Sequence, residues 1–338
     1  MAEIRTEITE IVTGLGMLGY GSLERAIATR PAAVRNVTNA HFARLEAAYR
    51  AESHDELFAV SWDNGIVFAR SVDGLRGRPP HTLEWKGAHR PPAYEQIPAD
   101  LRVDHVYLIS CKYGSRILIN SSPSNLFDHR LVVREKAPID WFAVVAPVEY
   151  QEFYERVKTD FSVAGLPVSV DDLGREHRAA LKTVLPRRLS GETEAAYQAM
   201  NEEVAKASVA RWKRSLNTKG RREEMVWRLL RFQAAPYFIL GVGANDVPIR
   251  TRVATPWDAR NRYEFRDLEV EPGARSQAVV GWRAVFHDRV RQTPMFAAGH
   301  VEVRWSHGKF GQAPEAKVYL DTPYDEVPGY FRLDGDER

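Results

Sequence analysis

Apolar residues recur at helical spacing in several long stretches of the chain. In residues 36–54, Phe42, Leu45 and Tyr49 fall three or four positions apart and so share one face of a helix, behind polar residues that can cap its first turn. Pro186 closes another such stretch. The same spacing predicts helices over residues 36–54, 151–159, 171–185, 190–216 and 221–232.

Shorter apolar runs, rich in β-branched and aromatic residues, predict strands between these helices. Residues 56–62 and 66–71 are two such runs on either side of Asp63-Asn64-Gly65, and Asn-Gly between apolar runs is a strong hairpin signal. Residues 141–148 are almost continuously apolar, which is typical of a core strand covered on both faces. Further strands are predicted over residues 81–85, 104–113 and 116–120.

From residue 236 onward the pattern changes to short β-type runs separated by Gly, Pro and Asp. Strands at this spacing predict an antiparallel sheet or a small barrel. The runs cover residues 237–242, 250–254, 277–286, 300–305 and 316–320. Taken together, the pattern predicts an α+β fold, with a mixed sheet flanked by helices and a C-terminal β-rich domain.

The length of the chain points to more than one domain. It has 338 residues, whereas a single hydrophobic core usually stops growing near ~250–300 residues. We therefore expect a main core over residues 1–190, a basic helical segment over residues 191–235 and the β-rich domain over residues 236–338.

Composition excludes several classes of protein. Hydrophobic residues make up 44% of the chain and charged residues 27%, so a packed fold is expected rather than disorder. Residues 1–10 are too charged for a signal peptide, and no stretch reaches the ~18–20 apolar residues of a membrane span. The single cysteine, Cys111, excludes an internal disulfide and lies in an apolar run, which favours a structural thiol over a nucleophile. We expect a cytoplasmic protein with no membrane partner.

Charge is unevenly distributed although the formal net charge is only +2. Residues 206–231 hold nine basic residues against two acidic ones, a local net charge of +7. Most of these basic residues lie outside the apolar faces of the two predicted helices and are therefore exposed. We expect their side chains to bind backbone phosphates of a nucleic acid. Arg214, Arg221 and Arg222 are the residues that we assign to this role.

The most informative stretch is residues 102–128, RVDHVYLISCKYGSRILINSSPSNLFD. An apolar strand ends in Ser110-Cys111-Lys112, and a second apolar run leads to a polar turn before a helix start. Here the chain resembles the PD-(D/E)xK restriction-endonuclease-like superfamily, in which a strand carries an acid two positions before a lysine. Ser110 stands where that acid usually is. The resemblance covers roughly residues 60–130 and implies a restriction-endonuclease-like sheet with Ser110 and Lys112 as catalytic residues.

Hydrolysis of a phosphodiester in this superfamily uses Mg²⁺, which carboxylates hold while a lysine stabilises the transition state. Ser110 and Lys112 can share a site because side chains two apart on a strand face the same side. A first acid should then come from nearby. Glu84, within His81-Thr-Leu-Glu-Trp-Lys86, and Asp104 are the candidates that we assign as catalytic acids and metal ligands.

Each alternative for this acid has a geometric difficulty. A straight strand over residues 104–112 would place Asp104 ~26 Å from Lys112, unless the chain bends. Asp100 has a spacing that suits short members of the superfamily, but it leaves little room for a hairpin before Ser110. Asp63 could pair with Glu84 and Lys86 in another register, although it looks like a turn aspartate.

A second polar patch lies in residues 299–317, GHVEVRWSHGKFGQAPEAK. Its basic and hydroxyl side chains surround a Gly-containing turn beside a tryptophan, a mixture that can contact phosphates and base edges. A solvated hairpin face is the competing interpretation, and a metal site at His300 and His307 lacks an evident third ligand. The nucleic-acid-binding residues that we assign here are Arg304, Ser306, His307, Lys309 and Lys317.

These observations lead to the hypothesis of a Mg²⁺-dependent DNA endonuclease of a restriction or phage-defence system. A homodimer would suit double-strand cleavage. The alternatives are a noncatalytic nucleic-acid-binding subunit and a protein-assembly subunit. An acid within a few ångströms of Lys112 would favour the nuclease, since a binding module needs none.

Overall fold

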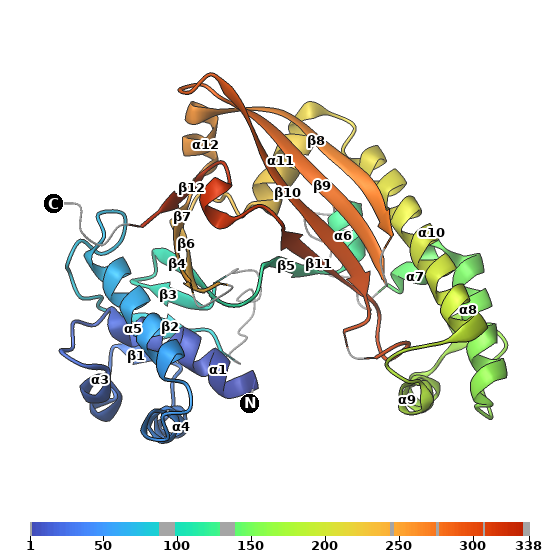
Figure 1. Cartoon of the computed structure of the whole chain (residues 1–338), viewed down its shortest axis with the longest axis horizontal. Coiled ribbons are helices and arrows are strands. Elements are labelled where there is room, and N and C mark those ends of the chain that lie inside the picture. The colour runs from blue at the N-terminus through green and yellow to red at the C-terminus, as the bar shows by residue number, and fades with distance from the viewer. Residues whose placement is uncertain are drawn as a thin grey trace. The chain divides into compact units, whose positions relative to one another are not determined.

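A computed structural model of the chain describes residues 2–87, 99–128, 139–243, 247–274, 277–306 and 308–333 (Figure 1). It has an α+β fold, as the sequence predicts, with a seven-stranded mixed sheet and a separate five-stranded antiparallel sheet. The chain forms two compact units. Unit 1 comprises Met1–Arg116, Arg231–Glu264 and Pro323–Arg338, and unit 2 comprises Ile117–Leu230 and Phe265–Thr322.

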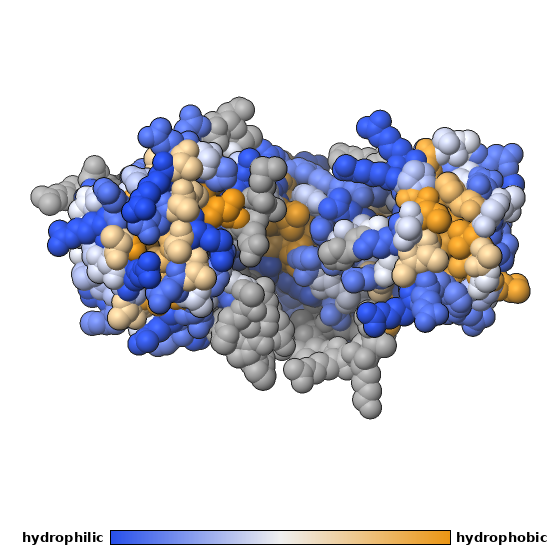
Figure 2. Space-filling model, turned by 90° about the horizontal axis from the view of Figure 1, so that it is seen from below, coloured by the Kyte–Doolittle hydropathy of each residue, from blue (hydrophilic) through white to orange (hydrophobic). Residues whose placement is uncertain are grey.

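Both units are therefore built from segments that are distant in the sequence. The assignment of a nuclease core to residues 1–190, a basic helical segment to residues 191–235 and a β-rich recognition domain to residues 236–338 stays a prediction. Within the described residues, no helix combines the length and apolarity that crossing a membrane requires. Figure 2 shows one face of the molecule, on which apolar side chains gather in patches among hydrophilic ones.

The sheet of unit 1 has the strand order β1-β2-β3-β4-β6-β7-β12. The pairs β1–β2 and β4–β6 are parallel, and the others are antiparallel. Its strands are β1 (Val34–Arg35), β2 (Leu83–Trp85), β3 (Leu101–Val103), β4 (Tyr107–Tyr113), β6 (Tyr237–Val242), β7 (Pro248–Val253) and β12 (Tyr330–Arg332). The predicted strands over residues 81–85, 104–113, 237–242 and 250–254 are confirmed in this sheet.

One face of this sheet carries the hydrophobic core of unit 1. Leu83, Leu101, Val103 and Ile109 alternate with polar residues along β2–β4 and are each 0% exposed. They pack on N-terminal helices, drawn in blue in Figure 1. These are α1 (Ala2–Glu7), the π-helix η1 (Ile8–Val12), α2 (Thr13–Gly16), α3 (Leu23–Thr29), α4 (Asn39–Arg50) and α5 (Asp55–Arg70). Unit 1 also contains α12 (Pro256–Arg262) and the 3₁₀ turn η5 (Tyr324–Glu326).

The predicted hairpin over residues 56–71 is wrong, because this segment is helix α5. Gly65 is needed for helix packing rather than for a turn: a Cβ there would lie 2.1 Å from the Thr13 carbonyl oxygen of α2. Asn64 is fully buried, and its Nδ2 donates to the Gly241 carbonyl oxygen at 3.0 Å. Tertiary packing of Asn-Gly therefore overrides its local turn preference.

Unit 2 is organised around its antiparallel sheet, with the order β5-β11-β10-β9-β8. The expected antiparallel sheet of the C-terminal part is thus confirmed for the later strands. These strands are β5 (Ile117–Ser121), β8 (Tyr263–Ala274), β9 (Ala278–Asp288), β10 (Thr293–Arg304) and β11 (Glu315–Leu320). The helices of unit 2 are α6 (Pro123–Phe127), α7 (Trp141–Val145), α8 (Pro147–Phe161), the 3₁₀ turn η3 (Val170–Asp172), α9 (Arg175–Val184), α10 (Gly191–Ser215) and α11 (Lys219–Leu229).

The predicted core strand over residues 141–148 is also wrong. The segment forms α7 and the first turn of α8, with Pro147 at the first position of α8, where its missing N–H costs no hydrogen bond. Trp141 is buried and its Nε1 donates to the Ser208 hydroxyl of α10 at 2.9 Å. A short apolar run has no periodicity that separates a buried strand from a buried helix.

The close crossing of α2 and α5 gives a stability prediction. Gly65→Ala should lower the free energy of unfolding by about 1–3 kcal/mol or more, because the new Cβ overlaps the Thr13 carbonyl. Gly21→Ala is the control, since no heavy atom lies within 4 Å of a Cβ at that position. Denaturant unfolding measures both. Equal stability of the two variants would contradict the packing argument.

Candidate functional site

Ser110 and Lys112 lie on β4, on the face of the sheet opposite the hydrophobic core. Their neighbours Ile109 and Cys111 point to the core, so alternation fixes both polar side chains on the other face. Lys112 pairs with Gly241 of β6. A Cβ on Gly241 would lie 2.0 Å from the Lys112 carbonyl oxygen, so this glycine permits the close approach of the two strands.

Asp100 is the acid that the structure places beside these residues. Its Oδ2 accepts hydrogen bonds from the Ser110 hydroxyl at 3.3 Å and from the Cys111 backbone N–H at 2.7 Å. Strand β3 begins one residue later, at Leu101, which pairs with Ile109, so the Asp100 carboxylate bonds to β4 just beyond the last β3–β4 pair. The few residues between Asp100 and Ser110 can form a hairpin because Asp104 and His105 both adopt positive φ in its turn.

The charges around Lys112 act in opposite directions. Burial lowers the pKa of its ammonium group, the Asp100 carboxylate opposes this effect, and the Arg231 guanidinium adds to it. Glu10, from η1, also favours the charged lysine. Tyr237 lies on the same face of the sheet, and its phenol has a pKa raised by burial. An acid, a hydroxyl and a cation thus share one face, which is a typical setting for acid–base or phosphate chemistry.

Cys111 points away from this group of residues. Burial, together with the Asp100 and Glu10 carboxylates, raises the pKa of its thiol well above the ordinary value. A thiol in that state is a poor nucleophile at neutral pH, which agrees with the structural role expected from the sequence.

The cysteine offers a direct test of this environment. Cys111 should react with a thiol reagent far more slowly in the native protein than in urea-unfolded protein at pH 7.5, because the thiolate is disfavoured. A spectrophotometric thiol titration measures both rates on the single cysteine of the chain. Comparable rates would contradict the burial of this group.

Glu84 and Asp104 are held elsewhere in unit 1. Glu84 of β2 forms an ion pair with Arg102 of β3, and strand spacing places its Cα about 16 Å from that of Lys112. Asp104 lies in the β3–β4 turn, at the opposite end of β4 from Lys112, and pairs with Arg78 at 2.6 Å. The structure therefore brings Asp100, and neither of these two acids, next to Ser110 and Lys112.

Asp104 instead stabilises its turn. It accepts hydrogen bonds from the backbone N–H groups of His81 at 2.7 Å and Thr82 at 3.0 Å. Burial acts to raise the pKa of this carboxyl, but the hydrogen bonds and Arg78 outweigh it, so the pKa is lowered. The charged form thus stabilises the fold above the unfolded-state pKa, and this contribution disappears as the pH falls through the lowered folded-state pKa.

Asp104→Asn should therefore destabilise unit 1 by about 1.5–3 kcal/mol at pH 7, the range for hydrogen bonds to a charged group. The difference from wild type should shrink as the pH is lowered toward 3. Urea unfolding across this pH range measures it, with Glu52→Gln as an exposed-acid control. A difference that does not depend on pH would show that the carboxylate charge is not responsible.

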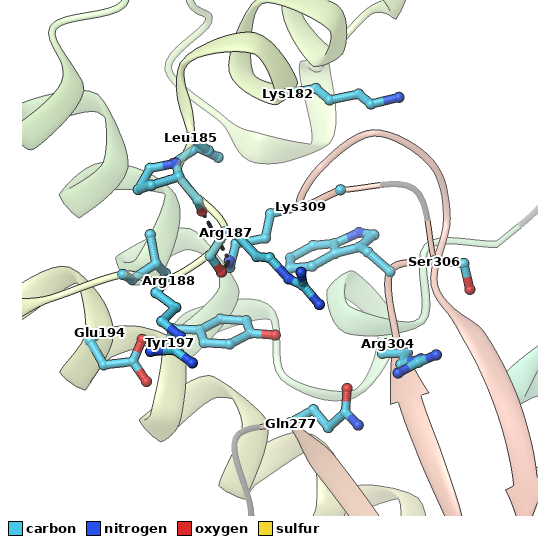
Figure 3. Close-up of a pocket in the computed structure, with 14 residues that line it drawn as sticks. Lys182, Leu185, Arg187, Arg188, Glu194, Tyr197, Gln277, Arg304, Ser306 and Lys309 are labelled. Atoms are coloured by element: carbon cyan, nitrogen blue, oxygen red, sulfur yellow. Dashed lines mark hydrogen bonds between the residues drawn. The ribbon is translucent and has the colours of Figure 1, made fainter. Parts of the chain in front are cut away.

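The second polar patch lies in unit 2, at an open cavity of about 1140 Å³ (Figure 3). The segment between α9 and α10 forms one side of the cavity, and the end of β10 with its following turn forms another. Five basic residues and one acidic residue are among those that line it. The lining residues are Lys182, Leu185, Pro186, Arg187, Arg188, Leu189, Glu194, Tyr197, Gln277, Arg304, Trp305, Ser306, Gly308 and Lys309.

Three of the predicted nucleic-acid-binding residues meet at this cavity, namely Arg304, Ser306 and Lys309. Each has a partner within unit 2. The Arg304 Nη1 lies 3.3 Å from Glu302 Oε2, and the Ser306 hydroxyl donates to Glu315. The Lys309 ammonium donates to the Arg187 carbonyl oxygen at 3.0 Å. His307 lies outside the described residues.

The other predicted binding residues lie away from the cavity lining. Lys317 of β11 is 3.8 Å from Glu315. Arg214 is exposed near the end of α10, and Arg222 of α11 pairs with Asp267 at 2.7 Å. Arg221 Nη1 donates to the Ser215 carbonyl oxygen at 3.3 Å, so it helps to join α10 to α11.

Sequence reasoning missed four residues of this cavity. Lys182, Arg187, Arg188 and Tyr197 received no role, although Arg187-Arg188 directly follows the proline that closes a predicted helix. Two adjacent cations at a break between helices are exposed by necessity, and that signal could have identified them.

The chain was compared with protein-family models, with curated proteins and with solved structures, and none matches. The resemblance to the PD-(D/E)xK superfamily therefore rests on residues of this chain alone. Among the described residues, no three His, Cys, Asp or Glu side chains form a group that could hold a metal ion by themselves.

Proposed function

We propose that unit 1 is a Mg²⁺-dependent DNA endonuclease whose site contains Asp100, Ser110 and Lys112. The observation that supports this most directly is the Asp100 carboxylate, which accepts a hydrogen bond from Ser110 and is the main charge favouring the Lys112 ammonium. This is the acid-and-lysine arrangement that the resemblance implies, with the acid supplied from the start of β3. A role in a restriction or phage-defence system is part of the same proposal.

The residues present suit Mg²⁺ rather than a metal with a full protein cage. Mg²⁺ is usually held by one or two carboxylates plus substrate phosphates, with its remaining positions filled by water. Asp100 would be its principal ligand: both hydrogen bonds to this carboxylate end on Oδ2, which leaves Oδ1 directed elsewhere. When bound, Mg²⁺ would activate water and neutralise charge on the phosphate.

The protein side chains would have distinct roles in this reaction. Lys112 would stabilise the negative charge that develops on the phosphate oxygens, and Arg231 would add to the positive potential around it. Ser110 would hold Asp100 in place through its hydroxyl hydrogen bond. These roles require a charged Lys112, so cleavage should slow as the pH rises through its lowered pKa.

A pair of matched substitutions tests which acid acts. Asp100→Asn should reduce Mg²⁺-dependent cleavage by about 10²-fold or more, whereas Glu84→Gln should leave it within about twofold of wild type. Both exchange one carboxylate for an amide on the same face of one sheet. Nicking of supercoiled plasmid DNA, with and without Mg²⁺, measures the rates. Loss of activity in Glu84→Gln alone would move the site to β2.

Lys112→Met tests the lysine. The rate should fall by about 10²–10³-fold while the melting temperature stays equal or rises, because burial already disfavours the ammonium group. DNA affinity should change little, since the lysine acts mainly in the transition state. Cleavage at the wild-type rate would exclude this assignment, and complete absence of metal-dependent cleavage by the wild type would exclude the nuclease.

The alternative is nucleic-acid binding without hydrolysis, and the basic cavity of unit 2 favours it. The two functions can be separated because binding needs no metal. DNA binding that persists while no cleavage is detected, on plasmid, phage and modified DNA, would support the noncatalytic subunit. Size-exclusion chromatography on the same samples would show whether a homodimer forms.

A further inference from the structure

The cavity of unit 2 combines exposed cations with aromatic rings. Arg187 and Arg188 are exposed in the segment that follows α9, and neither forms an ion pair with any described residue. Figure 3 shows Arg187 projecting toward the middle of the cavity, with Arg304 across from Tyr197. Cations without a carboxylate partner keep their full capacity to bind an anion.

Lys309 holds this segment in position. Its ammonium group donates to the carbonyl oxygens of Arg187 at 3.0 Å and Pro186 at 3.5 Å, and partial burial lowers its pKa. These bonds fix the backbone from which both arginine side chains extend. Lys309 is therefore a positioning residue, and the two arginines are the groups that can contact a ligand.

Two aromatic rings supply an apolar surface beside these cations. Tyr197 of α10 and Trp305, after β10, are nearly parallel, with 14° between their planes and 6.4 Å between their centroids. The ring centroid of Trp305 lies 4.6 Å from that of Phe142 and 5.2 Å from that of Phe310, so packing fixes the orientation of this indole. Half-buried rings of this kind are typical platforms for stacking a nucleic-acid base.

We infer that this cavity binds a nucleotide unit, with Arg187 and Arg188 on its phosphate groups and the base against Tyr197 and Trp305. Its volume of about 1140 Å³ exceeds the ~300–1,000 Å³ of typical small-molecule sites, so a phosphate and a base fit together. The excess of five basic residues over one acidic residue matches a polyanion. The inference concerns unit 2 alone and does not depend on hydrolysis in unit 1.

The nucleotide can be free or part of a single strand, because both present the same base and phosphate. Isothermal titration of the full chain without Mg²⁺ would use three probes: dAMP, inorganic pyrophosphate and a 5′-phosphorylated single-stranded oligonucleotide of eight thymidines. The wild-type protein should bind at least one base-bearing probe. Tighter binding of the oligonucleotide would identify a strand as the source, and tighter binding of dAMP would identify a free nucleotide.

Two variants separate the phosphate and base contacts. The double substitution Arg187→Ala and Arg188→Ala should weaken binding of all phosphate probes tenfold or more and reduce the salt slope of oligonucleotide binding by one to two units. Tyr197→Leu should weaken dAMP or oligonucleotide binding by about five- to hundredfold and leave pyrophosphate binding unchanged.

The control is the double substitution Arg289→Ala and Arg291→Ala. It removes the same charge from exposed positions in unit 2, near the start of β10 rather than its end at Arg304. This variant should bind like wild type. Equal weakening in both double variants would overturn the inference in favour of general charge attraction. Absence of binding by any base-bearing probe, or an unchanged affinity in Tyr197→Leu, would overturn it as well, whatever the outcome for DNA cleavage.

Discussion

The parallel pairing of β4 with β6 is the interaction on which the candidate site of unit 1 depends. The two strands belong to parts of unit 1 separated in the sequence by residues 117–230 of unit 2. Their pairing buries Ile109 and Leu240 in the core and leaves Ser110, Lys112 and Tyr237 on the other face. Parallel pairing requires a long crossover connection, and here that connection includes residues 117–230, which form part of unit 2.

Glycine at position 241 allows the backbones of β4 and β6 to approach closely enough to pair. With no side chain, Gly241 lets its strand run against the Lys112 backbone, and its carbonyl oxygen accepts from the Asn64 side chain of α5. Asn64 in turn accepts from Arg250 of β7 at 2.8 Å. Helix, strand and site are thus tied together by buried hydrogen bonds, which are costly to leave unsatisfied.

Secondary structure was predicted correctly where a regular apolar pattern extends over many residues. It was predicted wrongly where tertiary packing determines the conformation of a short segment. Helix α10 and the strands around Ser110 followed from their spacing alone, as did the α+β class. Asn64 was assigned to a hairpin turn and Trp141 to a strand because their local preferences suit these structures. In the fold, a buried amide and a buried indole instead satisfy their hydrogen bonds with partners distant in the sequence. Such partners cannot be read from a window of neighbouring residues.

The same limit explains which site residues were found. Ser110 and Lys112 are two positions apart on one strand, so alternation alone places them together. The acid was harder to choose among Asp100, Asp104 and Glu84. Which of these reaches Ser110 and Lys112 depends on the β3–β4 turn, where two residues adopt positive φ. In unit 2, Tyr197 and Trp305 come from a helix and a strand end that only the fold brings side by side.

Burial distinguishes the kinds of chemistry that the two groups of cations can support. Lys112 is held near a carboxylate in surroundings that lower its pKa, which suits a residue acting on a developing charge. Arg187 and Arg188 are exposed, and a guanidinium group is only weakly hydrated, so contact with a phosphate costs them little solvation. A half-buried cation with an acid beside it favours catalysis, whereas exposed cations beside aromatic rings favour binding. The two proposals therefore assign hydrolysis to unit 1 and nucleotide binding to unit 2 for a single physical reason, the degree to which water is excluded around each charge.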